Sequence, residues 1–210
     1  MIHYLLGYGS LITKESRYNT SNTGKCLPVK LNNYKRYWNA RINKNNKKYT
    51  AVSIDYSPNS KINAIITVIN KDDLPFYDKR EKNYERIRIK NSDIRDYETN
   101  KVISNKTVIW TYKIKPKFNK LPSYKYPILQ SYIDLILTGC NRISYKFMVD
   151  FINSTSKWSN TKDKRYNWVN DRTKPVYNFN CNELCHKKKL IDGLLKHYKP
   201  IEYSKIKYIY

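Results

Sequence analysis

The chain has 210 residues, and its 41 Lys plus Arg against 17 Asp plus Glu give a formal net charge of +24. A content of 40% hydrophobic and 14% aromatic residues excludes a disordered basic tail, because such tails contain few aromatic side chains. The length suffices for one domain with its own core. The lack of long apolar runs and of a basic leader segment argues against a transmembrane helix and a secretory signal.

The positive charge has two explanations that lead to different functions. A basic surface attracts phosphate groups, which would point to a nucleic-acid partner. However, 31 Lys, 24 Asn, 23 Ile and 21 Tyr make up 99 of the 210 residues, and all four types have A/T-rich codons. Lys also outnumbers Arg 31 to 10, although Arg recognises phosphate better. We therefore favour a coding bias, as in an A/T-rich microbe or a large DNA virus, over nucleic-acid binding. We expect a cytoplasmic protein, in the host cytoplasm if it is viral.

The first half of the chain has patterns typical of β-strands. Residues 2–6 form a short apolar run that enters a glycine-containing loop, and residues 27–41 alternate loosely between polar and apolar. Residues 49–56 and 62–69 are rich in strand formers and flank a Ser-Pro-Asn-Ser-Lys segment, which predicts a β-hairpin. The second of these runs is apolar on both faces, so we expect it to be a central strand.

A short helix is expected next, because Asp72 or Asp73 can cap its first turn. The residues that it carries would be Leu74, Phe76, Tyr77 and Glu81. Alternating side chains then predict two further strands, at residues 86–90 and 108–114.

The second half has the three- and four-residue spacing of apolar side chains that is typical of helices. The first predicted helix begins at residue 128 and ends at Gly139, and two more cover residues 143–152 and 182–198. Strands followed by helices indicate an α+β domain, and we expect its sheet to close into a barrel.

Two segments of the first half are candidates for chemistry. In residues 7–11 (Gly-Tyr-Gly-Ser-Leu), the glycines let the backbone turn sharply and present N–H groups to an anion. An ordinary tight turn would have the same sequence. Glu81 lies in a charged run, where most carboxylates are solvated, but it is also placed where a helix ends and a strand begins. A carboxylate partly removed from water at such a place can serve as a general acid or base.

A third segment, residues 158–175, contains two tryptophans, an Asp-Arg pair and a proline. We interpret it as an ordered flap that is anchored by Trp158 and Trp168 and held by an ion pair.

The cysteines predict neither a disulfide framework nor a metal site. They are spread along the chain, which favours reduced thiols, at Cys26, Cys140, Cys181 and Cys185. Zinc could find ligands in Cys181, Cys185, His186 and His197, but the second closely spaced pair of a structural zinc site is missing. The sequence also lacks a Walker A loop, a Rossmann fingerprint and a Gly-x-Ser-x-Gly elbow.

Taken in this order, the segments resemble the γ-glutamylcyclotransferase-like superfamily. Residues 6–11 (Leu-Gly-Tyr-Gly-Ser-Leu) match its opening signature, and residues 80–84 look like the element that carries its catalytic glutamate. Residues 37–41 and 151–175 look like a microbial branch of the superfamily. Leu6 replaces a common aromatic residue, and a Gly-Gly pair found in glutathione-specific relatives is absent before Tyr84. These departures leave the substrate open.

The resemblance covers residues 2–178 and implies a domain over residues 1–178, a mixed β-barrel with flanking helices. Residues 179–210 would be a basic helical extension packed on the same domain. The implied enzyme is a transferase or lyase, as in glutathione metabolism, that releases 5-oxoproline from a small γ-glutamyl compound.

The resemblance assigns the general acid/base role to Glu81. It assigns substrate contacts to Tyr8, Gly9, Ser10 and Leu11 and, more weakly, to Tyr84, Asn39, Arg41 and Arg172. No metal, cofactor or membrane is implied, and no oligomeric state follows. The alternative is a noncatalytic domain of the same fold that binds polyanions or proteins through its basic C-terminal segment, with Lys187, Lys188, Lys189 and Lys196.

Overall fold

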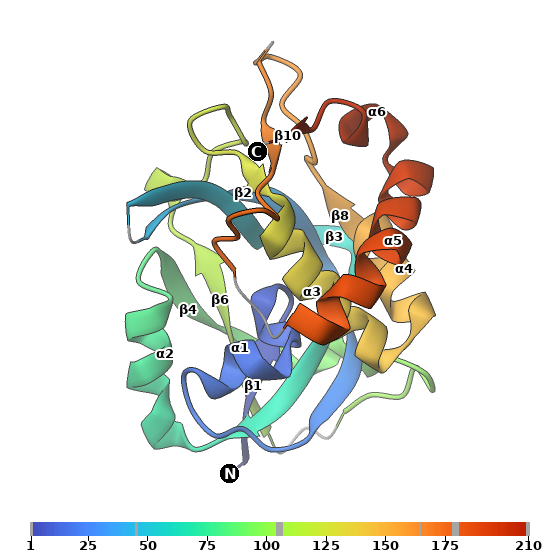
Figure 1. Ribbon diagram of the computed structural model, residues 1–210. Helices are drawn as coiled ribbons and strands as arrows, with labels where there is room; N and C mark the ends of the chain where they lie inside the picture. The colour runs from blue at the N-terminus through green and yellow to red at the C-terminus, as the bar shows by residue number, and fades with distance from the viewer. Residues whose placement is uncertain (1, 45, 104–106, 164, 178–180, 209–210) are drawn as a thin grey trace.

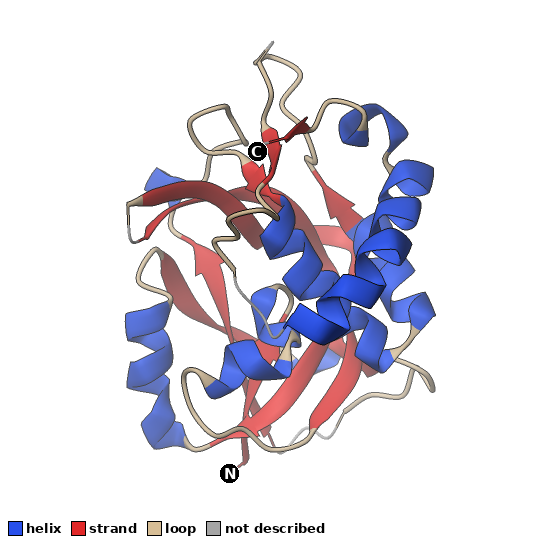
Figure 2. Ribbon diagram, viewed as in Figure 1, coloured by secondary structure: helices blue, strands red, loops and turns tan. Residues whose placement is uncertain are grey.

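The computed structural model describes residues 2–44, 46–103, 107–163, 165–177 and 181–208, without the side chains of residues 44 and 181–186. Within these residues, ten strands form one mixed sheet and helices cover it (Figure 1, Figure 2). The strands are β1 (Ile2–Gly7), β2 (Cys26–Lys44), β3 (Lys47–Ile69), β4 (Tyr84–Ile89), β5 (Ile94–Asp96), β6 (Thr107–Ile114), β7 (Ile128–Leu129), β8 (Thr155–Ser156), β9 (Trp168–Asn170) and β10 (Lys207–Tyr208). The helices are α1 (Lys14–Tyr18), α2 (Leu74–Arg80), α3 (Gln130–Ile143), α4 (Tyr145–Ser154), α5 (Cys181–Tyr198) and α6 (Pro200–Tyr203), with short 3-10 turns η1 (Ser10–Ile12), η2 (Lys71–Asp73), η3 (Asn91–Asp93) and η4 (Pro116–Phe118).

Strand β1 lies inside the sheet, between two neighbours. It pairs antiparallel with β3 and parallel with β6, in the strand order β10-β9-β7-β3-β1-β6-β4, and β2 pairs with β3. Because both edges of β1 are hydrogen-bonded, the loop that follows Gly7 starts from a fixed point. The α+β class is as expected. The order ends at β10 and β4, so the pairing does not show the barrel closure expected from the sequence.

The hairpin predicted around residues 57–61 is wrong, because β3 continues through this segment as one strand. Both halves of β3 pair with β2 instead, and the chain reverses between those two strands. The ladder has Tyr34 opposite Tyr56 and Asn32 opposite Lys61, which leaves the intervening residues of β3 as a bulge. Turn-forming residues here interrupt a ladder rather than reverse the chain, because β2 offers a partner on both sides of them.

Helix α3 forms where the apolar spacing predicts it, but it does not end at Gly139. It continues to Ile143, and no described glycine has a positive φ angle. Gly139 instead allows close packing, since an added Cβ would lie 2.5 Å from Thr13 Oγ1 and 3.0 Å from Thr13 Cα. This contact ties α3 to the segment that follows β1.

Helix α2 begins directly after the 3-10 turn η2. Asp73 holds the N-cap position of α2, as predicted, but its side chain makes no capping hydrogen bond; the side chain of Asn70 instead caps η2, by accepting a hydrogen bond from the Asp72 N–H (3.2 Å). The strands expected after this helix are confirmed as β4 and β6.

The C-terminal segment packs on the rest of the molecule. Helix α5 contacts α3 and α4, with Ile191, Leu194 and Leu195 buried, and the three helices lie side by side in Figure 2. Strand β10 pairs in parallel with β9. Among the described residues, we find no helix with the length and apolarity that crossing a membrane requires.

Candidate active site

The loop after β1 lies close to β3 and α3 because of Gly9. A Cβ on Gly9 would lie 2.7 Å from Val52 Cγ2 and 3.4 Å from the Tyr132 hydroxyl, so a larger residue would push the loop outward. The Ile12 N–H donates to the Gly9 carbonyl (2.9 Å) and closes the turn. This close approach places Ser10 at the edge of a pocket.

Glu81 lies where α2 ends and the chain turns into β4. Its N–H donates to the Tyr77 carbonyl (2.8 Å), and its carbonyl accepts from the Tyr84 N–H (2.7 Å), so its backbone is fixed on both sides. Its side chain is 17% exposed and lines the same pocket as Ser10. The structure thus places Glu81 between a short helix and a strand, as expected.

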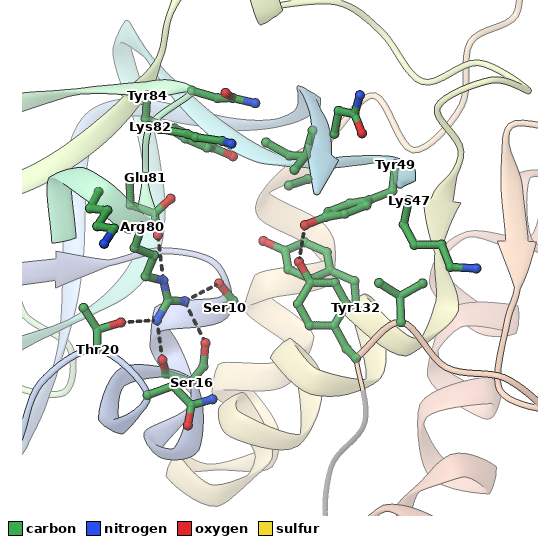
Figure 3. A pocket seen from close by; sticks show the side chains of 18 of the residues that line it. Ser10, Ser16, Thr20, Lys47, Tyr49, Arg80, Glu81, Lys82, Tyr84 and Tyr132 are labelled. Atoms are coloured by element: carbon green, nitrogen blue, oxygen red, sulfur yellow. Dashed lines mark hydrogen bonds and ion pairs between the residues drawn. The ribbon is translucent and has the colours of Figure 1, made fainter. Parts of the chain in front are cut away.

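Arg80 joins Glu81 to the segment after β1 (Figure 3). Its Nε lies 3.0 Å from Glu81 Oε1 in an ion pair. Its two terminal nitrogens donate to Thr20 Oγ1 (2.8 Å), Ser16 Oγ (2.8 Å), the Ser16 carbonyl and, at 3.4 Å, Ser10 Oγ. The guanidinium therefore connects Glu81 to the segment that follows β1.

Tyrosine side chains form the inner wall of the pocket (Figure 3). The hydroxyls of Tyr49 and Tyr177 are 2.6 Å apart, and the Tyr132 ring packs against both, with centroid distances of 6.2 and 4.8 Å. The Tyr84 hydroxyl donates to the Val52 carbonyl (3.0 Å). These tyrosines come from β3, α3, β4 and the segment before residue 178, so the pocket joins distant parts of the chain.

The negative charge of Glu81 acts on the tyrosines of the pocket and on the buried Tyr8. Burial raises the pKa of five tyrosines, and the negative charge of Glu81 raises each pKa further: Tyr8, Tyr49, Tyr84, Tyr132 and Tyr177. Their hydroxyls are therefore neutral at physiological pH and keep their protons for hydrogen bonds.

The pocket has a volume of about 950 Å³, which is in the size range of small-molecule sites. Besides Arg80, three lysines line it: Lys47, Lys79 and Lys82. Glu81 is the one acidic residue in this lining. The excess of positive charge favours small anionic ligands.

The structure brings three of the proposed site residues together in this lining: Glu81, Ser10 and Tyr84. Tyr8 and Leu11 are buried and are not among the lining residues. The Tyr8 hydroxyl donates to the Tyr112 carbonyl (2.5 Å), which holds the loop against β6. Gly9 acts through the close approach described above.

Asn39 and Arg41 are not among the residues that line the pocket. The Asn39 side chain donates to Asn119 Oδ1 (2.9 Å), and Arg41 donates to the Leu121 carbonyl (3.0 Å) while stacking on Tyr126. Both hold the strand β2 against a neighbouring loop, so their positions do not favour the predicted substrate contacts.

Arg172 is also outside the pocket lining and is used in an ion-pair network. It donates twice to the fully buried Asp134 of α3, at 2.7 Å each, and once to Asp192 of α5 (2.8 Å). Trp158 and Trp168 are buried and pack on each other, as expected for a Trp-anchored segment. The ion pair therefore links the segment to two helices.

Several pocket residues were not singled out from the sequence: Arg80, Tyr49, Tyr132, Tyr177, Lys47, Lys79 and Lys82. The tyrosines have the spacing of ordinary strand or core positions, and the cations lie in charged runs. No local pattern separates them from the other tyrosines and lysines of this composition.

The zinc ligands considered at Cys181, Cys185 and His186 lie outside the described side chains. Elsewhere in the described chain, no group of three His, Cys, Asp or Glu residues is placed to hold a metal ion. Cys26 and Cys140 are both free thiols.

Known proteins resemble this chain in structure rather than in sequence. No protein-family model and no curated protein matches it. A solved γ-glutamyl cyclotransferase superposes with a TM-score of 0.56 and 15% identity, over 72% of this chain and 86% of its own. The protein has a γ-glutamyl cyclotransferase-like fold. An uncharacterized protein from Homo sapiens matches this fold with a TM-score of 0.55 and 15% identity, over 75% of this chain and 91% of its own. YkqA from Bacillus subtilis also matches this fold, with a TM-score of 0.51 and 14% identity, over 70% of this chain and 51% of its own.

These similarities bear out the family resemblance at the level of the fold. Identities of 14–15% carry neither an activity nor a source organism to this chain.

Proposed function

We propose that the protein is a γ-glutamyl cyclotransferase that acts on a small γ-glutamyl compound. The observation that carries this proposal is that Glu81 and Ser10 line one pocket in a chain of this fold. A partly buried carboxylate beside neutral hydroxyl groups suits proton transfer.

The reaction needs no nucleophile from the protein, because the substrate's own α-amine attacks its γ-carbonyl. A new C–N bond closes a five-membered ring, and the original amide C–N bond breaks to release an amine and 5-oxoproline. Glu81 takes the proton that the attacking nitrogen loses and delivers it to the leaving nitrogen. The pocket must hold the folded conformer of the substrate, and such orientation alone contributes several kcal/mol.

The segment after β1 would bind the substrate's α-carboxylate or its developing oxyanion. Ser10 contributes its hydroxyl from the pocket edge, and the Tyr132 hydroxyl lies beside the same loop. Because Tyr132 stays neutral, it can donate a hydrogen bond to an anionic group throughout the physiological pH range.

The charge of the pocket favours substrates that carry negative groups beyond the γ-glutamyl unit. Lys47, Lys79 and Lys82 line the pocket outside the Glu81–Arg80 pair. A γ-glutamyl peptide with a free carboxylate fits this charge better than a γ-glutamyl amine whose leaving group is neutral or cationic.

The decisive experiment measures 5-oxoproline release from γ-glutamyl dipeptides, glutathione and γ-glutamyl amines. Replacing Glu81 by Gln should lower kcat on the order of 10²-fold or more. The matched control is Glu85→Gln, which removes an exposed carboxylate of β4 outside the pocket lining and should keep wild-type activity.

Equal inertness of wild type and Glu81→Gln toward all three substrate classes would sink the enzymatic proposal. The noncatalytic alternative would then be tested by binding to duplex DNA, which should weaken steeply as salt increases if the basic surface is functional.

A further inference from the structure

All three nitrogens of the Arg80 guanidinium group make hydrogen bonds within the site (Figure 3). One side of the fork meets the Glu81 carboxylate at 3.0 Å, and the other reaches Thr20, Ser16 and Ser10. The planar guanidinium has five N–H donors in a fixed geometry, so contacts on both sides determine its position closely. With 20% of its side chain exposed, Arg80 is about as shielded from solvent as Glu81.

This arrangement determines where the Glu81 carboxylate lies. A glutamate side chain has several rotatable bonds, and holding it in one conformation costs entropy unless contacts fix it. Arg80 provides such a contact from the residue next to Glu81, and Ser16 of α1 together with Thr20 after it fixes Arg80. The carboxylate is therefore positioned relative to Ser10, which contacts the same guanidinium.

The charges support the same role. The other hydrogen-bond partners given above for Arg80 are hydroxyl and carbonyl oxygens, which are neutral. The positive charge of the guanidinium is thus directed to Glu81, where it stabilises the ionised carboxylate that must accept a proton.

We infer that Arg80 is a positioning residue for Glu81, which orients the carboxylate and keeps it ready to accept a proton. This inference rests on the proposed function. The residue would act on the proton-transfer step more than on substrate affinity.

The test compares Arg80→Ala and Arg80→Lys with the wild type, using 5-oxoproline release and thermal unfolding. Arg80→Ala should lower kcat by roughly 10- to 100-fold, with a much smaller change in KM, because a misplaced catalytic group costs rate. Arg80→Lys keeps the positive charge but not the forked geometry of the guanidinium, so its kcat should lie between those of the wild type and Arg80→Ala. Millimolar guanidinium chloride should restore part of the kcat of Arg80→Ala and none of the kcat of Glu81→Gln.

The matched control is Arg88→Ala, which removes an exposed arginine of β4 outside the pocket lining and should leave kcat unchanged. Wild-type kcat in Arg80→Ala would overturn the inference, and so would a loss of kcat that follows the loss of stability and is not rescued by guanidinium. If Arg80→Ala does not fold, the test relies on Arg80→Lys. A wild-type kcat in Arg80→Lys would then overturn the inference. A wild type that releases no 5-oxoproline refutes the proposed function as well, whereas an active wild type with unaffected Arg80 variants refutes only this inference.

Discussion

Replacing Gly139 by Ala should destabilise the protein, although alanine is the better helix former. In the interior of a helix, this change alone is worth about 1 kcal/mol in favour of Ala. At Gly139, however, the new Cβ would meet Thr13 at 2.5 Å from Oγ1, 3.0 Å from Cα and 3.2 Å from Cβ. Two of these are atoms at or next to the backbone, so the side chain of Thr13 cannot simply rotate away.

The structure allows the size of the effect to be worked out. Overpacking a tight contact costs about 1–3 kcal/mol. Separating the two segments would also weaken the hydrogen bond from Thr13 Oγ1 to the Leu135 carbonyl (2.9 Å), worth about 1 kcal/mol. After the gain in helix propensity is subtracted, we expect a net loss of about 1–3 kcal/mol, with a fall in Tm of about 2–4 °C for each kcal/mol. Because Thr13 directly follows η1, Ser10 should shift and kcat should fall too.

The matched control is Gly193→Ala in α5, where a Cβ would meet no atom within 4 Å. That variant should gain up to about 1 kcal/mol, because helix propensity acts there without a clash. Thermal and urea unfolding of both variants give the comparison. If Gly139→Ala is as stable as the wild type, or if both variants shift in the same direction, the close-packing explanation is wrong.

Three further predictions test the ion pairs, the pocket charge and the tyrosines. Arg172→Met should cost about 3–5 kcal/mol in urea unfolding, since it leaves the buried Asp134 without its positively charged partner; near-wild-type stability would contradict this. Lys79→Glu should raise KM for a γ-glutamyl dipeptide by roughly 3- to 10-fold at low salt, and much less for its C-terminal amide or for the exposed control Lys25→Glu. Burial raises the pKa of four pocket tyrosines and of the buried Tyr8, so the stability from their neutral hydroxyls is complete below about pH 10 and is lost as pH rises through the higher folded-state values. The last part of the tyrosinate absorbance change should therefore coincide with the loss of far-UV circular dichroism above pH 10, and ionisation of all 21 tyrosines without unfolding would refute the assignment; the residues are Tyr8, Tyr49, Tyr84, Tyr132 and Tyr177.

Local patterns predict the elements of this fold better than their ends and pairings. The apolar spacing gives α3 and the alternation gives β4, because both depend on neighbouring residues. The false hairpin at residues 57–61 shows the limit of such reasoning. The same turn-forming residues occur where a chain reverses and where a strand bulges. Which of the two forms here depends on the pairing with β2, whose residues lie at a distance in the sequence. Gly139 is a similar case, since its partner Thr13 is 126 positions earlier.

The residues of the pocket lining were predictable where a backbone motif places them and unpredictable where side chains converge from distant parts of the chain. Ser10 follows a glycine-containing loop, and Glu81 stands at a helix–strand junction, so both have local signals. Arg172 has the sequence environment of a site residue, yet it binds Asp134 and Asp192. Sequence alone cannot separate a charged residue that faces a pocket from one that joins helices, because both appear in ordered segments next to aromatic residues.

Three close contacts determine how Ser10 and Glu81 lie relative to each other in the pocket lining. Gly9 brings the loop against β3 and α3, Gly139 brings α3 against Thr13, and Arg80 links the loop to Glu81. Each contact fixes a different pair of elements, so loosening any one of them changes the distance between Ser10 and Glu81. The large net charge plays no part in this geometry. It acts through the few lysines of the lining, by favouring anionic ligands, while the orientation of the carboxylate depends on close packing and on one guanidinium.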